Sequence, residues 1–160
     1  MLTRTLSLPE ELLLLLLNPE SGKLEIKDRV AMQAALGGAV LLELSLLGRI
    51  DTDLTHITLI DDTNASEELG PAEAYVYRRL FGDQDLSIRH WVYETYQYFD
   101  LLQDMLMSRM INNGMISRRT KSYFGLFKKQ RYVLAESAAQ RDVKRRLMTV
   151  LFSDDIPNSR

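Results

Sequence analysis

The sequence predicts a mainly α-helical fold, a single helical domain with short β-hairpins. Apolar side chains recur every three or four residues from Ile88 to Met110, and a mostly apolar segment from Asp28 to Leu47 ends at Gly48. Alternation of apolar and polar residues, which is typical of strands, is confined to short segments. The chain has 160 residues, 46% of them hydrophobic, which suits one domain with its own core. We expect this domain to cover residues 1–152 and residues 153–160 to form a disordered tail.

The amino-terminal segment predicts a short buried helix. Ser7-Leu8-Pro9-Glu10 is typical of a helix start, because serine can cap the helix, proline fits the first turn and glutamate can reach back to the cap. The leucine run from Glu10 to Leu17 is apolar on every side, which indicates burial. A turn is expected at residues 18–22 and a short strand at residues 23–26.

The second helix, from Asp28 to Leu47, is nearly long enough to cross a membrane. Gln33 and Glu43 interrupt it, and a central carboxylate costs about 2.5–3.5 kcal/mol on insertion. We therefore interpret it as a helix buried on most sides. Gly37-Gly38 in its middle costs about 1 kcal/mol per glycine, and the usual compensation is the close approach of another element.

The middle of the chain predicts a hairpin followed by two helices. Residues 49–53 and 55–60 alternate in polarity as a half-buried hairpin does, and residues 61–70 predict a polar loop. A short helix is expected from Pro71 to Gly82, and one long helix from its cap at Ser87 to a stop at Asn113-Gly114.

The last third predicts a second hairpin and a basic helix. Residues 123–127 and 131–134 flank Lys128-Lys129-Gln130, which indicates a turn, so we expect a hairpin that projects near residues 121–134. A helix from about Ser137 to Phe152 follows.

Catalytic chemistry has little support in the sequence. The chain has no cysteine, which excludes disulfides and thiolate nucleophiles, and with no recognisable signal peptide it predicts a cytoplasmic protein. His90 and Glu94 lie four residues apart on a helix, a spacing that could hold a metal but more often makes a surface contact. We interpret the chain as non-enzymatic, with no cofactor and no metal site.

Charge is distributed unevenly along the chain. Residues 1–114 contain 9 Lys or Arg and 18 Asp or Glu, whereas residues 115–152 contain 10 Lys or Arg and 2 Asp or Glu. Basic residues near an anionic bilayer contribute about 1 kcal/mol each, so about four to six on one face suffice for reversible docking. Phe127 beside Lys128 and Lys129 could insert while the lysines meet head groups. The candidate lipid-binding surface consists of Arg118, Arg119, Lys121, Lys128, Lys129, Arg131, Arg141, Lys144 and Arg145, with Arg146 beside them.

Several segments, in their order along the chain, resemble one known family. They are Leu8-Pro9-Glu10-Glu11 with the leucine run, Leu36 to Leu44 through Gly48-Arg49-Ile50, Asn113-Gly114-Met115-Ile116, and Tyr123-Phe124-Gly125-Leu126-Phe127 with the basic helix. From about Leu6 to Phe152 the chain resembles the Golgi phosphoprotein 3 family, which includes eukaryotic Golgi proteins and many bacterial proteins. The resemblance implies a mostly helical fold and a projecting hairpin used in self-association. The candidate oligomerisation residues are Tyr123, Phe124, Leu126, Phe127, Tyr132 and Val133.

The resemblance also implies an adaptor that binds phosphatidylinositol 4-phosphate at a membrane surface and, in eukaryotic members, retains glycosyltransferases as clients. The eukaryotic head-group pocket uses a tryptophan and several arginines, and an ungapped alignment places these positions at Asp28, Gly37, Asp100 and Gln103. Phosphate needs cationic donors, so this pocket is not carried over and general anionic docking is expected. Because the family usually continues with further helices, we expect a short member, a fragment, or a core completed by oligomerising.

Three functional hypotheses follow. The leading one is a peripheral membrane adaptor that binds anionic lipid. The second is an oligomeric structural protein whose basic hairpin region pairs with the acidic part of another subunit. The third is a winged-helix-like nucleic-acid binder, which is less favoured because Leu41 to Leu47 offers only Glu43 and Ser45 as polar residues.

Overall fold

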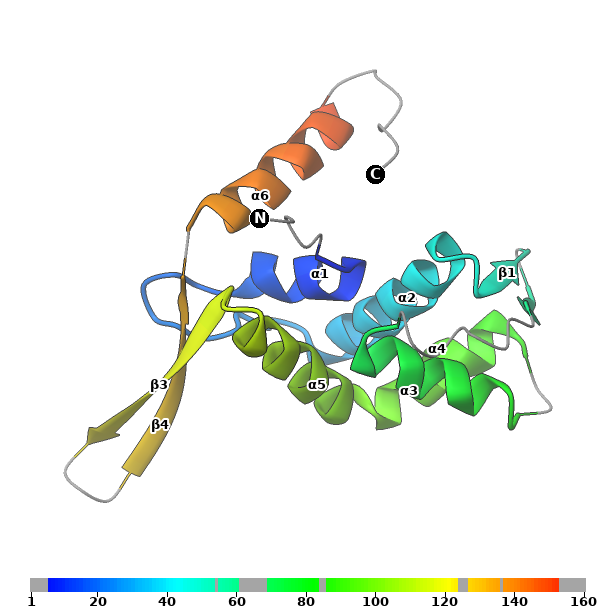
Figure 1. Ribbon diagram of the computed structural model, residues 1–160, viewed down its shortest axis with the longest axis horizontal. Coiled ribbons are helices and arrows are strands. Elements are labelled where there is room, and N and C mark those ends of the chain that lie inside the picture. The colour runs from blue at the N-terminus through cyan, green and yellow to red at the C-terminus, as the bar shows by residue number, and fades with distance from the viewer. Residues whose placement is uncertain are drawn as a thin grey trace.

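Helices dominate the architecture, as the sequence predicts. A computed structural model describes residues 6–53, 55–60, 69–83, 86–123, 127–135 and 137–152. Figure 1 shows α1 to α5 assembled into one helical body, the β3–β4 hairpin projecting from one end, and α6 extending beyond α1. The elements are α1 (Leu8–Leu16), α2 (Arg29–Leu46), β1 (Ile50–Thr52), β2 (Ile57–Leu59), α3 (Pro71–Leu80), α4 (Ile88–Gln97), α5 (Phe99–Asn112), β3 (Ile116–Tyr123), β4 (Phe127–Leu134) and α6 (Ser137–Phe152).

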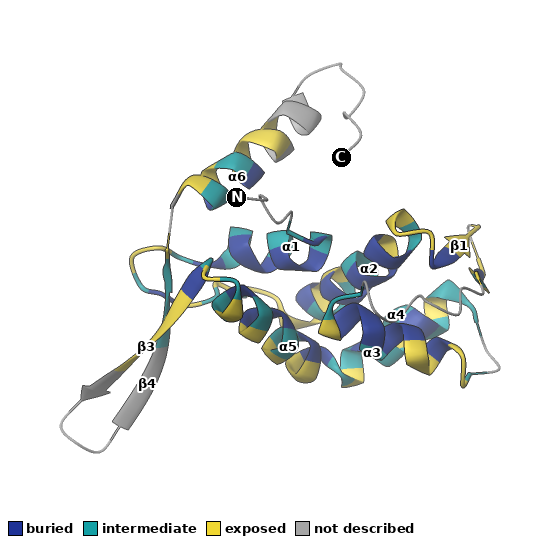
Figure 2. Ribbon diagram, viewed as in Figure 1, coloured by how far each residue is buried: buried dark blue, intermediate teal, exposed yellow. Residues whose placement is uncertain are grey.

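The core lies where the first five helices face one another. Leu13 of α1, Leu36 of α2, Leu80 of α3, Trp91 of α4 and Leu102 of α5 are all fully buried. Figure 2 shows that buried residues gather on these helices, whereas the described parts of β3 and α6 are mostly exposed or half-buried. The helical body is therefore the support, and the carboxy-terminal elements are its outward-facing part.

Helix α1 begins as predicted, and its leucine run is buried or half-buried against the core. The Glu10 carboxylate accepts a hydrogen bond from the Ser7 N–H at 3.0 Å, so the glutamate reaches back to the cap. Leu13 and Leu14 are buried, whereas Leu15 is only half-buried. The strand expected at residues 23–26 is wrong, because its one described pairing is an isolated bridge between Leu24 and Leu17.

Helix α2 crosses the body with one side covered and the other open. A Cβ on Gly37 would lie 1.9 Å from the Thr95 Oγ1 of α4, which confirms the expected close approach, whereas Gly38 has nothing within 4 Å. Leu42 and Leu46 are exposed, so burial on most sides is wrong. Among the described residues, α2 is the one helix long and apolar enough to suit a membrane span, a test that core helices also pass.

The helix expected from Ser87 to Asn112 is two helices. Helix α4 ends at Gln97 and α5 begins at Phe99, with Tyr98 between them at φ −100° and ψ 6°. The Arg79 guanidinium of α3 lies 4.4 Å from the centre of the Tyr98 ring, which holds this residue against α3. The periodicity of apolar residues continues across the break, so it gives no sign of it.

The boundaries of the first hairpin and of α3 agree with the predictions. The β1–β2 pairing, with Ile50 opposite Leu59, lies within the predicted first hairpin, and α3 lies within its predicted range. Gly48 and Gly114 adopt φ values of 66° and 72°, the left-handed conformation that ends a helix. Most of the expected loop at 61–70, and all of the expected tail at 153–160, lie outside the described residues.

Candidate functional site

The β3–β4 ribbon places basic residues opposite one another across its two strands. Arg119 pairs with Arg131 and Lys121 pairs with Lys129, and strand alternation puts these four positions on one face. Residues in directly opposite positions have Cβ atoms about 4.5–5.5 Å apart, a spacing at which like charges destabilise the pairing. An anion that met this face would relieve the repulsion. The ribbon therefore has the charge arrangement of an anion-binding element.

The turn expected at Lys128-Lys129-Gln130 is wrong. These residues lie inside β4, which begins at Phe127, and the strands are joined through residues 124–126, outside the described residues. The hairpin is also longer than expected, because β3 begins at Ile116. The segment from Arg118 to Lys121 is polar throughout, so it lacks the alternation from which a strand is recognised.

The root of the ribbon is fixed to the body. Ile116 is buried in the core, and the Ala135 N–H donates to the Met115 carbonyl at 2.9 Å. The Tyr132 N–H donates to the Gly22 carbonyl at 2.8 Å. Gly22 has a φ of 66°, and a Cβ there would lie 2.7 Å from the Tyr132 oxygen. The turn after α1, expected at residues 18–22, thus contacts the root of the hairpin through Gly22.

Helix α6 is attached to α1 through a buried glutamine. The Gln140 Nε2 donates to the Leu14 carbonyl at 2.8 Å and to the Leu17 carbonyl at 2.6 Å, two acceptors at the end of α1. Val143 is buried on the same side. The Arg146 Nη2 lies 2.7 Å from the Glu11 Oε1. These contacts hold one side of α6 against α1 and leave Arg141 and Arg145 exposed.

The predicted basic surface is divided into two areas. Figure 1 shows the ribbon and α6 leading away from their junction in opposite directions, so they do not form one continuous face. On the ribbon, Arg118 and Arg119 are exposed and Arg131 is half-buried near the root, while Lys121, Lys128 and Lys129 are placed by their backbone register. On α6, Arg141, Lys144 and Arg145 are exposed.

Two arginines of α6 are engaged with carboxylates. Arg145 pairs with Asp142, and Arg146 pairs with both Glu11 and Asp142. Arg146 therefore has a structural role in holding α6 to α1. Its ion pairs raise the pKa of the guanidinium, chiefly through the hydrogen bond to Glu11.

The candidate oligomerisation residues occupy both ends of the ribbon. Tyr132 and Val133 are half-buried near the root, and Tyr132 packs against the core of its own chain. Tyr123 and Phe127 are opposite each other at the distal end of the described ribbon. Phe124 and Leu126 lie outside the described residues. Self-association through this hairpin stays a prediction.

The positions of the eukaryotic head-group pocket have other uses in this chain. Asp28 caps α2 by accepting the Ala31 N–H at 3.0 Å. Asp100 accepts both of its hydrogen bonds from Arg29, at 2.8 and 2.9 Å. Gly37 is the close-approach point with α4, and Gln103 is half-buried. Arg29, the arginine nearest to these positions in sequence, is thus paired with a carboxylate. This agrees with the expectation that the chain lacks the head-group pocket of the eukaryotic proteins.

The structure contains a buried charge cluster that the sequence does not predict. Glu10 of α1 and Glu73 of α3 are each 1% exposed, and both face Arg109 of α5, whose Nε lies 3.5 Å from the Glu10 Oε1 and Nη1 3.6 Å from the Glu73 Oε1. Burial raises the pKa of Glu10, although Ser7 and Arg109 act against the increase. No spacing rule links these residues, because the cluster exists only once three helices have packed.

The side-chain partner of His90 is not Glu94, the residue with which a surface contact was expected. The His90 Nε2 lies 2.9 Å from the Asp83 Oδ2, in the turn before its helix, so Asp83 is its carboxylate partner and Glu94 is not. Within the part of the chain that the structure describes, no group of three or more His, Asp or Glu side chains could hold a metal ion.

Comparison with known proteins identifies relatives of this chain. The chain is 27% identical over 168 residues to the vacuolar protein sorting-associated protein 74 of Eremothecium gossypii. That alignment covers 92% of the chain and 49% of the relative, so the chain spans about half the length of the curated relative it matches. Residues 8–160 match the family described as Golgi phosphoprotein 3 (GPP34), a range that contains all ten elements of the fold. The chain therefore belongs to the Golgi phosphoprotein 3 family.

Proposed function

We propose that this chain is a non-enzymatic peripheral adaptor that docks onto anionic lipid at the cytoplasmic surface of a membrane. The observation that carries the proposal is the pair of like-charge positions across the ribbon, Arg119 with Arg131 and Lys121 with Lys129. Arg119, Lys121 and Lys129, which lie farther from the root than Arg131, contribute about 3 kcal/mol near an anionic bilayer, which corresponds to a dissociation constant of about 6 mM. Docking of this strength is weak and reversible, as a peripheral protein requires.

Two further features add to this attraction. Tyr123 and Phe127, opposite each other near the tip, supply aromatic residues of the kind that settle at the membrane–water interface. Arg141 and Lys144 of α6 are exposed and make no ion pair among the described residues. The family name supports a membrane of the Golgi type as the setting in which such docking takes place.

We propose recognition of anionic charge and not of one head group. Phosphatidylinositol 4-phosphate is the ligand implied by the family resemblance, but Asp28 and Asp100 bring carboxylates to two of its pocket positions. Neither carboxylate supplies the cationic donor that phosphate needs at these positions, and the nearby Arg29 already has two hydrogen bonds to Asp100. Vesicles with phosphatidylserine or with phosphatidylinositol 4-phosphate should therefore bind equally when their surface charge is matched.

Vesicle co-sedimentation tests the proposal. The double variant Arg119→Thr/Lys121→Thr removes one cation from each opposed pair while keeping residues that suit a strand. At about 1 kcal/mol per charge, binding to phosphatidylserine vesicles should weaken about 30-fold. The control Arg78→Ala/Arg89→Ala removes the same charge from exposed positions on α3 and α4 and should change binding little. Failure of the wild type to bind anionic vesicles at low salt would overturn the proposal.

A structural oligomer is the second candidate, and the charge asymmetry favours it. The segment up to residue 114 is as strongly acidic as residues 115–152 are basic, so one copy could present its ribbon to the acidic body of another. Exposed ion pairs of this kind are screened by salt. Light scattering at increasing salt should then show an oligomer falling to the monomer mass, whereas an unchanged mass would exclude this mode of assembly.

A further inference from the structure

A pocket of about 580 Å³ lies beside α6, at the end of α1 and the start of α2. This volume is within the usual range of about 300–1,000 Å³ for small-molecule sites. Apolar side chains from α1, from the following loop and from α2 form much of its wall, namely Leu15, Leu16, Ile26, Ala31, Met32 and Ala35. The pocket thus offers an apolar surface that a hydrocarbon chain can cover.

Four charged residues also line the pocket, two acidic and two basic. The acidic residues have hydrogen-bond partners within the chain. The Glu25 carboxylate accepts a hydrogen bond from the Asn18 side chain, and the Asp28 carboxylate caps α2. Lys27 and Lys144 make no hydrogen bond or ion pair among the described residues. The acids are thus already satisfied by the chain itself, whereas the two ammonium groups are available to a ligand.

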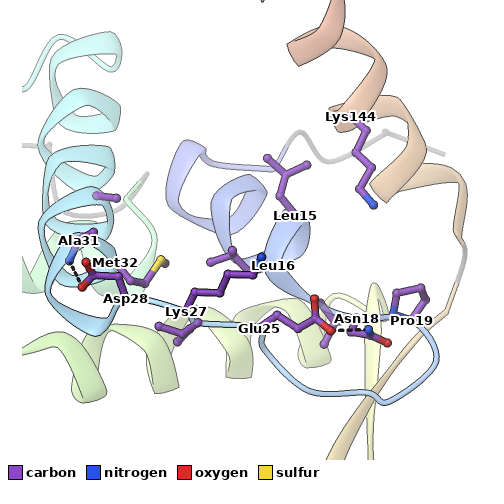
Figure 3. A pocket seen from close by; sticks show the side chains of 13 residues that line it. Leu15, Leu16, Asn18, Pro19, Glu25, Lys27, Asp28, Ala31, Met32 and Lys144 are labelled. Carbon is purple, nitrogen blue, oxygen red and sulfur yellow. Dashed lines mark hydrogen bonds between the residues drawn. The ribbon is translucent and has the colours of Figure 1, made fainter.

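The two lysines reach the pocket from different elements. Figure 3 shows Lys144 extending from α6 toward the end of α1, and Lys27 extending from the loop before α2 toward Leu16. Both lysines are exposed, and Figure 3 shows Leu15 and Leu16 between them, with Ala31 and Met32 on the other side of Lys27. An occupant complementary to this arrangement has an anionic group for the rim and an apolar part for the wall.

We propose that this pocket binds a single acyl chain of an anionic lipid, with the chain on the apolar wall and the head group between Lys27 and Lys144. The inference rests on the proposed function: the ribbon attracts the membrane, and the pocket then holds one of its lipids. The site is separate from the opposed cations of the ribbon. Of the four positions aligned with the eukaryotic head-group pocket, Asp28 lines this pocket, whereas Gly37, Asp100 and Gln103 do not.

Calorimetric titration with lysophosphatidic acid, kept below its micelle concentration, tests the inference without a membrane. The wild type should bind this lipid, should not bind inorganic phosphate, and should bind a monoacylglycerol of the same chain length at least about tenfold more weakly. Lys27→Ala and Lys144→Ala should each weaken binding of lysophosphatidic acid about fivefold. The control Lys23→Ala removes a lysine from the same loop, outside the pocket lining, and should bind like the wild type.

A pocket-filling variant gives an independent arm. Ala35→Phe places a ring in the pocket from an exposed position of α2 and should abolish binding, whereas Val30→Phe, exposed on the same helix outside the lining, should not. The lysine variants are surface changes and should stay folded, so the test does not depend on Ala35→Phe alone. Unchanged lipid affinity in Ala35→Phe and in both lysine variants would show the assignment to be wrong.

The same proteins on anionic vesicles separate the two proposals. If the wild type binds vesicles but not lysophosphatidic acid, the pocket inference falls and the proposed function stands. If it binds neither, both fall. If Ala35→Phe leaves lipid binding intact and instead lowers the mass of an oligomer in light scattering, the pocket receives a second copy of the chain and not a lipid.

Discussion

Glu10 and Glu73 share a single guanidinium inside the body. Both carboxylates are buried and face Arg109. Burial raises the pKa of Glu10 above its usual 4.5, so the folded chain binds a proton there more tightly than the unfolded chain does. The stability contributed by this proton is fully present below pH 4.5 and is lost as the pH rises through the raised pKa.

The variant Glu10→Gln tests this linkage. Its amide oxygen can still accept the Ser7 N–H, but the variant has no carboxylate to bury in ionised form. The unfolding temperature of the wild type should therefore fall, relative to that of the variant, as the pH increases from 4.5 to neutral. Thermal unfolding followed by circular dichroism measures the difference, with exposed Glu20→Gln as the control. Curves that stay parallel over this interval would rule out the proton linkage at Glu10.

Single residues also show where sequence reasoning stops. The reach of Glu10 to Ser7 was predictable, because the two are three positions apart in one helix start. The convergence of Glu73 and Arg109 on Glu10 was not, because it depends on how α1, α3 and α5 pack. The sequence likewise does not predict that Lys27 lines a pocket together with Lys144, because this depends on the position of α6.

At the level of elements, the approach of α2 to α4 is controlled by one of two adjacent glycines. Gly37 faces Thr95 across the contact, and Gly38 faces open space. Gly37→Ala should destabilise the fold by about 1–3 kcal/mol, the usual cost of overpacking. Gly38→Ala should stabilise it by about 1 kcal/mol, because alanine is the better helix former. Chemical denaturation of the matched pair measures both, and equal effects would contradict the helix contact.

The attachment of α6 depends on one side chain. Gln140→Ala removes the donor to the Leu14 and Leu17 carbonyls, and a buried acceptor left without a partner costs about 1–3 kcal/mol. We expect α6 to separate from α1 more readily while the body stays folded. Hydrogen exchange should then increase in α6 and not in α5. Gln97→Ala, at an exposed position of α4, is the control.

Elements were predicted well where burial imposes a period and poorly where it does not. Helices α1, α2, α3 and α6 agree closely with their predicted ranges, because each presents an apolar side to the body or an evident cap. The ribbon was placed too late in the chain, because most of its length has no core face to pattern it. The break at Tyr98 was invisible, since the apolar positions on both sides of it face the same core.

The whole molecule has an acidic helical body and two basic extensions. The fold class and the charge asymmetry were both readable from the sequence, whereas the division of the basic surface between ribbon and α6 required the structure. The body also leaves one side of α2 open, with Leu42 and Leu46 exposed. The surfaces proposed for lipid thus lie on the periphery of the fold and include none of the buried charged residues that the structure describes, namely Glu10, Glu43, Arg49 and Glu73.

The opposed cations of the ribbon also make the pairing of its strands depend on whether an anionic membrane is bound. A two-stranded ribbon has little stability of its own, and Arg119 facing Arg131 and Lys121 facing Lys129 reduce it further. A charged bilayer then acts as a ligand of the paired form alone, and mass action shifts the ribbon toward pairing. Amide protons at Arg119 and Arg131 should therefore exchange more slowly on vesicles than in buffer, because their N–H groups point across the ribbon, whereas the neighbouring Tyr132 N–H points to Gly22. Amide exchange in the ribbon backbone thus reports whether the ribbon is bound to a membrane.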